Sequence, residues 1–375
     1  MADKAKRIIV SVINDLVTDQ RVSRTCHELH SMGYKVLLVG RKLPNSLEMP
    51  PVPYQVKRMN LLFKKGALFY AFYNWRLFWL LLFSKSDILW SNDLDTLLAN
   101  RMAGELKGNP IIFDSHEYFT EVPELDHNKF AKKVWKKIEG SIVPKLKYCI
   151  TVNNSIANLF KEKYNNDFCV IRNVPVKNTQ PKTKSRADLG MPEGKTILIL
   201  QGSGINVDRG SEELVESFKH LPDQYHLYIV GSGDVMGVLK KMVIDLKLES
   251  KISFVGKQPY SELIQYTMNS DAGLTLDKNT NINYQFSLPN KIFDYIQCGI
   301  PVISSDLVEL RNIVTHYQIG TIVKEVKPEI IANTIQNFFT TPLVYQQAKA
   351  NTIRAAQELN WEVEKKLLHQ LLSEV

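Results

Sequence analysis

The chain has 375 residues, of which 44% are hydrophobic and 23% charged, so it can form two globular domains, and its composition excludes a disordered protein. Its net charge is +8, with 26 Lys and Arg against 17 Asp and Glu in residues 1–175 and 21 against 22 thereafter. This asymmetry indicates a membrane or nucleic acid as partner of the first half, or simply a basic proteome; because no zinc finger or aromatic–arginine module is present, we favour a membrane.

The cysteines and the first residues indicate a reducing compartment. The four cysteines form no Cys-x-x-Cys pair and no spacing with histidine that is typical of zinc, so we expect neither disulfides nor a structural zinc site. The apolar run that follows the basic residues of segment 1–14 is too short for the core of a signal peptide. We therefore expect a cytoplasmic protein.

Strand and helix patterns alternate from the start of the chain. Residues 7–13 are a β-branched run typical of a buried parallel strand, residues 21–32 have helical periodicity, and residues 34–40 form a second strand. This βαβ order predicts a doubly wound α/β domain. The loop at residues 14–20 lacks Gly-x-Gly-x-x-Gly, which argues against a nicotinamide site there.

The segment between Lys64 and Lys85 holds eight aromatic side chains within residues 69–83. Asn74 and Arg76 interrupt it, so it is too short to span a membrane, which takes roughly twenty apolar residues. A helix packed on the first sheet and a helix lying in the membrane interface fit about equally well. A basic run later in the chain tips the prediction toward the interface, because it would reach the same anionic surface. Its members are Lys129, Lys132, Lys133, Lys136 and Lys137.

Two later strands of the first half run into polar residues. Residues 86–90 lead to Asp93-Leu94-Asp95, an Asp-x-Asp pattern that often arises by chance, and we interpret it as a loop or helix cap rather than a metal site. Residues 111–118 carry polar side chains at the carboxyl end of a strand, where open α/β sheets bind ligands. The outstanding one is His116, for which a substrate contact and an ordinary loop hydrogen bond are equally good interpretations.

The second half begins after a polar linker at residues 177–195. A strand at residues 196–201 is followed by a glycine-rich turn and then by Arg209, which precedes a helix that Ser211 would cap. The strand at residues 227–231 ends in a second glycine turn. Its third glycine lies one position too late for a dinucleotide fingerprint, so we predict a loop that faces a nucleotide.

The stretch from Tyr284 to Glu309 carries the densest signal. Ser287 is a good N-cap and Pro289 suits a first helical position, which predicts a helix whose N-terminus can bind an anion. Lys291 in the first turn would contact a phosphate, and Asp294, three residues later, would hold a ribose diol. An ordinary exposed Lys–Asp pair is an equally good interpretation of this spacing.

The same stretch, Ser-Leu-Pro-Asn-Lys-x-Phe-Asp-Tyr followed by Gly-Ile-Pro-Val-Ile, resembles the signature of bacterial family 4 glycosyltransferases. The family is retaining and has the GT-B fold, two Rossmann-like doubly wound domains that face a cleft. The resemblance implies the following donor-binding residues: Gly202, Ser203, Gly204, Arg209, Gly231, Gly233, Val255, Ser287, Leu288, Pro289, Asn290, Lys291 and Asp294. Two positions depart from the family, since Phe286 stands where it has a Glu and Ser203 where it has an Arg.

In the first half, Asp19-Gln20-Arg21-Val22 resembles the opening of the family's acceptor domain. The resemblance implies an acceptor side composed of Asp19, Arg21, Asp114, His116 and Glu117. The catalytic residues that it implies are His116, Arg209 and Lys291, with no metal and no cofactor apart from the nucleotide-sugar co-substrate.

These observations predict an α/β GT-B protein with an acceptor domain at residues 1–176, a nucleotide-sugar domain at 177–355 and a terminal helix, 356–375, that crosses back. The expected activity is transfer of a hexose to a carbohydrate or lipid-linked acceptor in cell-surface polysaccharide or glycolipid synthesis, at the inner face of the membrane and without nucleic acid. A catalytically silent GT-B protein that binds a nucleotide-sugar or a partner transferase is the alternative, because of Phe286 and Ser203. A nucleotide-sugar epimerase on the same fold is a weaker one.

Overall fold

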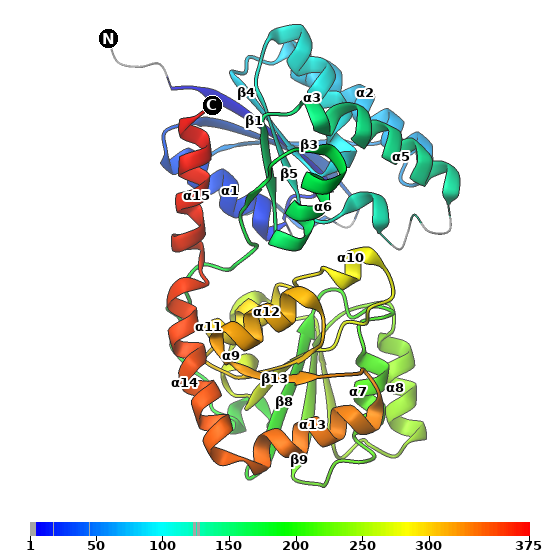
Figure 1. Cartoon of the computed structure of the whole chain (residues 1–375), viewed down its shortest axis with the longest axis vertical. Coiled ribbons are helices and arrows are strands. Elements are labelled where there is room, and N and C mark those ends of the chain that lie inside the picture. Colours follow the sequence, from blue (N-terminus) through cyan, green and yellow to red (C-terminus); the bar gives the residue numbers. More distant parts are fainter. Residues whose placement is uncertain (1–4, 18, 45, 123–124, 126–127) are drawn as a thin grey trace. The chain divides into compact units, whose positions relative to one another are not determined.

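The computed structural model describes residues 5–17, 19–44, 46–122, 125 and 128–375 and divides into two compact units (Figure 1). The first unit comprises residues 1–173 and 365–375, and the second comprises residues 174–364. Parallel strands alternate with helices in both units. The predicted α/β fold with two doubly wound sheets is therefore confirmed.

The sheet of the first unit has seven parallel strands in the order β3-β2-β1-β4-β5-β6-β7. These are β1 (Arg7–Asp15), β2 (Lys35–Lys42), β3 (Gln55–Asn60), β4 (Ile88–Asn92), β5 (Ile111–Ser115), β6 (Tyr148–Thr151) and β7 (Cys169–Val170). The central strands β4 and β5 are buried along their whole length, as continuous apolar runs in a covered parallel sheet are. The strand order reverses between β1 and β4, the point at which such sheets bind ligands.

Helices cover both faces of this sheet. They are α1 (Gln20–Ser31), α2 (Gly66–Phe83), α3 (Leu94–Lys107), α5 (Lys129–Ile142) and α6 (Asn154–Tyr164), with short 3-10 turns at Phe119–Glu121 and Val143–Lys145. Figure 1 shows α2 and α3 side by side. The end of α15 (Trp361–Ser373) packs on α1, where Glu28 contacts His369 at 2.7 Å and Lys365 at 3.3 Å.

The second unit repeats the pattern with six parallel strands in the order β10-β9-β8-β11-β12-β13. The strands are β8 (Thr196–Gly202), β9 (Tyr225–Gly231), β10 (Ile252–Gly256), β11 (Ala272–Thr275), β12 (Val302–Ser305) and β13 (Gly320–Val323). The helices are α7 (Ser211–Ser217), α8 (Met236–Asp245), α9 (Tyr260–Met268), α10 (Ile282–Gln285), α11 (Lys291–Gln297), α12 (Val308–Tyr317), α13 (Pro328–Thr340) and α14 (Pro342–Glu358), and Ala187–Leu189 forms a 3-10 turn. The switch point of this sheet lies between β8 and β11.

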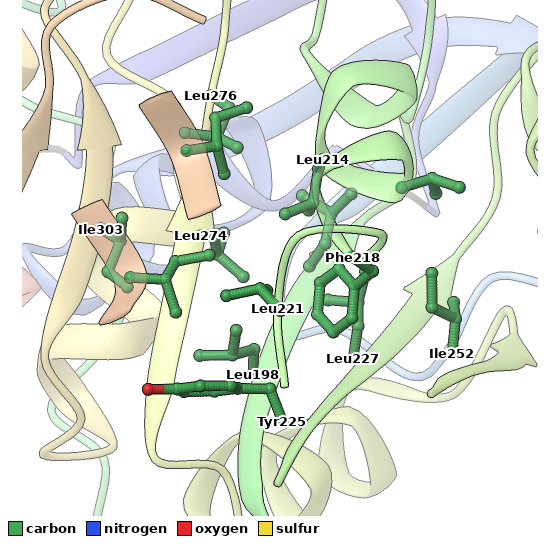
Figure 2. Close-up of a cluster of buried hydrophobic side chains, with 14 of the residues drawn as sticks. Leu198, Leu214, Phe218, Leu221, Tyr225, Leu227, Ile252, Leu274, Leu276 and Ile303 are labelled. Carbon is green, nitrogen blue, oxygen red and sulfur yellow. The ribbon is translucent and has the colours of Figure 1, made fainter. Parts of the chain in front are cut away.

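Alternate residues of β8 build two separate cores in the second unit. Leu198 and Leu200 pack with α7, α8 and α13 on one face, whereas Ile197 and Ile199 pack with α11 and α12 on the other. Figure 2 shows the first core, in which Phe218 at the end of α7 lies beside Leu227 of β9. Because both faces are covered, only the edges of the sheet are left to bind a ligand.

No helix among the described residues is long and apolar enough to cross a membrane.

Candidate functional site

The loops that follow β8 and β9 in the second unit are tied together at the carboxyl edge of the sheet. Ser232 donates its N–H to the Gly202 carbonyl and Ile205 donates to the Ser232 carbonyl, both at 3.0 Å. A Cβ on Gly231 would lie 1.8 Å from the Gly202 oxygen, so only glycine fits there. The two predicted glycine turns thus form one surface, on which Ser203 and Gly204 are exposed.

Arg209 and Asp277 form an ion pair at the switch point. Nη1 of Arg209 lies 3.0 Å from Oδ2 of Asp277, a carboxylate with no exposed surface, and its guanidinium lies over the ring of Tyr284, 4.4 Å from the centroid. Gly210, with φ at 69°, begins the next helix in place of the predicted cap Ser211. A Cβ at position 210 would lie 2.1 Å from the Leu276 carbonyl oxygen, so only glycine fits at this cap position.

Lys291 is the first residue of α11, and its Cε lies 4.0 Å from where a Cβ on Gly202 would stand. Burial lowers the pKa of Lys291, the nearby Asp277 carboxylate opposes that shift, and the Arg209 cation adds to it. Lys291 and Arg209 are both partly buried around this carboxylate, rather than exposed at the starts of their helices. A desolvated cation of this kind gains most from a bound anion.

The predicted start of this helix is wrong. Ser287 follows the short helix α10 and donates its N–H to the Tyr284 carbonyl, and the next helix begins three residues later, with Asn290 in the cap position. Leu288 and Pro289 lie partly buried in the intervening turn, and Phe286 ends α10. The hydroxyl of Ser287 is buried and has no hydrogen-bond partner among the described residues.

Asp294 is held by two side chains that the sequence did not indicate. Oδ2 accepts from Nε2 of Gln201 at 3.0 Å, and Oδ1 accepts from the Tyr260 hydroxyl at 2.9 Å. Thr267 in turn donates to Gln201 at 2.6 Å, which fixes the orientation of its amide. A carboxylate has about four acceptor sites, so Asp294 keeps capacity for a hydroxyl ligand.

Further polar atoms lie buried where β11 and β12 end. Within the described residues they have no hydrogen-bond partner, which in a folded protein calls for a water or a ligand. They are Oγ1 of Thr275, Oδ1 of Asp277 and the hydroxyls of Ser304 and Ser305. Val255, the remaining predicted donor residue, lies partly buried near the end of β10.

In the first unit, Arg21 and Asp114 form a buried bidentate pair. Nη2 and Nε of Arg21 lie 2.6 and 3.1 Å from the two carboxylate oxygens, and Nη1 donates to the Ile171 carbonyl at 2.8 Å. Although burial opposes ionisation, the charges of Arg21 and His116 hold the pKa of Asp114 well below its usual range. Arg21 and Asp114 are at most 5% exposed, so they lie beneath the surface and hold the more exposed residues of the site in position.

His116 lies between two carboxylates at the edge of this sheet. Its Nδ1 is 3.3 Å from Asp93, its Nε2 is 3.5 Å from Asp114, and its backbone N–H donates to Asp93 at 2.8 Å. Burial disfavours a charged imidazole, but the carboxylates of Asp93 and then Asp114 raise the pKa of His116 to about 9. Nε2 also lies 3.2 Å from Oδ1 of Asn92, so both ring nitrogens face acceptors of the protein, and the charged form of the ring is favoured.

The Asp93-Leu94-Asp95 pattern lies at the start of α3. Asp93 occupies the cap position, and its side chain accepts from His116 rather than from α3 itself. Burial, together with the Asp93 charge, raises the pKa of Asp95 well above its usual range, and the residue is only 5% exposed. No group of three or more metal-type side chains that could hold an ion is found among the described residues.

The other two acceptor-side residues lie in loops of the first unit. Asp19 caps α1 by accepting from the N–H of Val22 at 3.1 Å and also accepts from Asn14 at 3.0 Å. Glu117 follows His116 and is partly buried, and its carbonyl accepts from Ser115 at 2.7 Å.

Both halves of the chain match glycosyltransferase family models. Residues 19–174 match the model described as Glycosyltransferase Family 4, and residues 181–358 match Glycosyl transferases group 1. No curated protein sequence matches the chain significantly.

Several solved structures share the fold along nearly the whole chain. Sucrose-phosphate synthase from Thermosynechococcus elongatus has a TM-score of 0.81 at 16% identity, covering 98% of each chain. Anabaena HepE in complex with UDP has a TM-score of 0.75 at 14% identity, covering 99% of this chain and 100% of the other. WaaG, a glycosyltransferase involved in lipopolysaccharide biosynthesis, has 0.69 at 12%, covering 96% and 99%. The GT-B fold is thereby confirmed.

We predict that Lys291→Ala weakens the binding of a nucleoside diphosphate by about 1.5 to 3 kcal/mol, which is tenfold or more, because a charge-assisted contact is lost. Titration calorimetry checks this, with exposed Lys240→Ala on α8 as the control. Arg209→Ala would leave Asp277 buried without its partner, so Arg209 is best tested as the double variant Arg209→Ala/Asp277→Asn, for which we expect a similar loss. Unchanged affinity in both variants would remove the phosphate assignment.

We also predict a pH-dependent contribution of His116 to stability. Because its pKa is raised from 6.5 to about 9, its stabilising effect is complete below about pH 6.5 and disappears as the pH rises through about 9. The difference in unfolding free energy between wild type and His116→Asn should thus fall by on the order of 2 kcal/mol between about pH 6 and pH 9.5.

Urea unfolding at several pH values measures this difference. His226→Asn is the control of opposite sign, because burial lowers the pKa of His226 to about 4. The folded ring stays neutral in that range, so its difference changes only between about pH 6 and pH 7.5, where the unfolded ring loses its proton, and stays flat through about pH 9. A pH-independent difference for His116→Asn would show that the two carboxylates do not hold the proton.

Proposed function

Because the chain is a glycosyltransferase of the GT-B type, we propose that it moves a hexose-type sugar from a nucleotide-sugar to a carbohydrate or lipid-linked acceptor with retention at the anomeric carbon. The observation that carries this proposal is the convergence of Lys291 and Arg209 on the switch point of the second sheet. The second unit would bind the donor, and the first unit would contribute acceptor residues. HepE, which has the same fold, was solved with UDP and with UDP-glucose, in keeping with a nucleotide-sugar donor.

The leaving diphosphate would be stabilised by fixed cations. Lys291 and Arg209 both lie near the buried Asp277 carboxylate, and Lys291 also lies beside the glycine loop after β8. A diphosphate placed there supplies negative charge where water is largely excluded, and the charge that develops on it as the sugar departs is met without reorganisation. Asp294, oriented by Gln201 and Tyr260, would accept hydrogen bonds from the ribose hydroxyls.

His116 would contribute a fixed positive charge on the acceptor side of the site. Its proton is held by Asp93 and Asp114, so it does not remove the proton of the acceptor hydroxyl. That proton would pass to the departing phosphate oxygen on the same face of the sugar, which yields retention without a covalent intermediate.

We predict that turnover persists in EDTA, since side-chain cations take the place of a metal at the diphosphate. Release of nucleoside diphosphate is followed with a panel of nucleotide-sugars, with and without chelator. Loss of turnover that Mn²⁺ or Mg²⁺ restores would contradict this mechanism. Binding without turnover of any donor would instead favour the catalytically silent alternative.

We further propose that the first unit rests on the inner membrane surface through one face of α2. Phe69, Tyr73, Leu77 and Leu81 are buried along one side of this helix. The opposite side exposes Leu68, Trp75, Trp79 and Phe83, which are 63%, 58%, 42% and 79% accessible. One side of α2 therefore packs in the core, and the opposite side is an exposed apolar surface rich in tryptophan, which would lie in the membrane interface.

The basic run on α5 lies beside this helix, since Trp135 of α5 packs edge-on against Tyr70 of α2 at 5.2 Å. Two of its five lysines, Lys132 and Lys136, share one carboxylate, since both pair with Glu121 at 2.7 Å. The other three, Lys129, Lys133 and Lys137, are exposed. Each can contribute about 1 kcal/mol near anionic headgroups.

We predict that the chain floats with anionic liposomes at low salt. Binding should be reduced by Trp75→Ser/Trp79→Ser and by Lys129→Glu/Lys133→Glu/Lys137→Glu. The matched control reverses three exposed lysines of the second unit, Lys240, Lys241 and Lys247, and should leave binding unchanged. No flotation, or equal losses in test and control, would make α2 a purely structural helix.

A further inference from the structure

A pocket lies at the carboxyl edge of the first sheet, away from His116. Lys42 and Asn60, the last residues of the paired strands β2 and β3, line it together with Lys64, which precedes α2. Its volume is about 210 Å³. This is below the roughly 300 Å³ at which pockets for whole drug-sized ligands begin, so it suits one group of a larger molecule.

Three cations line this pocket without an acidic residue among them. They are Arg41, Lys42 and Lys64, and none forms an ion pair within the described residues. Nε of Arg41 is buried and has no hydrogen-bond partner there. The neighbouring Arg58, by contrast, is neutralised by Asp15 at 2.9 Å. Unpaired cations beside a partnerless buried donor indicate an anion site.

The pocket has apolar walls as well. Phe69 contributes its ring, over which the Arg41 guanidinium lies at 5.1 Å from the centroid, and Leu61 and Phe63 complete the side next to α2. The Phe63 ring contacts the ring of Phe72 on α2 edge-on at 5.7 Å between centroids, and its chain neighbour Leu62 is 76% accessible. The pocket therefore suits the anionic end of an amphiphilic molecule.

The place of the pocket on the sheet relates it to His116. In the order β3-β2-β1-β4-β5, the strand β5, which His116 follows, lies three positions from β2. At about 4.8 Å per strand this is about 14 Å along the edge, so a molecule anchored in the pocket would extend past β1 and β4 to reach His116.

We propose that this pocket binds the phosphate or diphosphate of the acceptor, an amphiphile whose apolar chain runs toward α2 and whose sugar lies toward His116. Assigning the phosphate to the acceptor rests on the proposed glycosyl transfer. Phosphate binding itself does not, because it follows from the unpaired cations alone.

Titration of the full chain with geranyl diphosphate tests the proposal. Lys42→Gln and Lys64→Gln, both at exposed lysines that make no ion pair, should each weaken its binding about tenfold or more, and Arg41→Gln should do the same. Lys57→Gln, an exposed lysine of β3 outside the pocket, is the matched control and should change nothing. UDP affinity, which reports on the second unit, should be unaffected in all of these variants.

Equal affinity of wild type and the pocket variants for geranyl diphosphate would overturn the proposal, as would a parallel loss of UDP binding. If inorganic pyrophosphate binds as tightly as geranyl diphosphate, the pocket is a site for free phosphate, and the assignment to an amphiphile is overturned. Variants that lose binding only to phosphatidylglycerol vesicles would make it a lipid headgroup site and overturn the acceptor assignment. If no nucleotide-sugar is turned over, the proposed function fails while this binding result still stands.

Discussion

One buried carboxylate organises the candidate donor site. Asp277 has no exposed surface and stands between Arg209, to which it is bonded, and Lys291, whose proton it helps to retain. Two cations thus converge on one buried carboxylate, and burial disfavours the charged form of Lys291, so an anion bound beside Lys291 would stabilise that charge. The glycine loops keep backbone, rather than side chains, beside these cations. The same electrostatic attraction would therefore stabilise this arrangement and bind the diphosphate of the donor.

In the first unit, the charged residues around His116 are paired with one another. There each charge is fixed by the next, from Arg21 to Asp114, from Asp114 to His116 and from His116 to Asp93. The chain of pairs begins inside the protein and ends at the sheet edge, so His116 presents a proton that it does not release. The basic pocket near β2 and β3 is the exception, because its cations have no such partners among the described residues. This contrast is why we assign it a ligand.

The sequence predicted the parts of the fold that depend on continuous apolar patterns. Central strands such as β8 were located within a residue or two, because buried parallel strands are uninterrupted apolar runs. The edge strands β3 and β13 were not identified, since half-exposed edges such as Gln55–Asn60 are largely polar. Helix starts shifted where tertiary contacts decided them, as at Gly210 against the Leu276 carbonyl. Tyr260 and Gln201 were missed because they reach Asp294 from other elements, a relation that no local pattern carries.

The central claim, that Lys291 is a desolvated cation completed by a diphosphate, can be measured directly by NMR titration of its labelled Nζ with and without saturating UDP. The account predicts a pKa below that of ordinary lysines in the free protein and a clear rise once the nucleotide is bound. A pKa that is already ordinary in the free protein, or one that does not move at saturation, would contradict it.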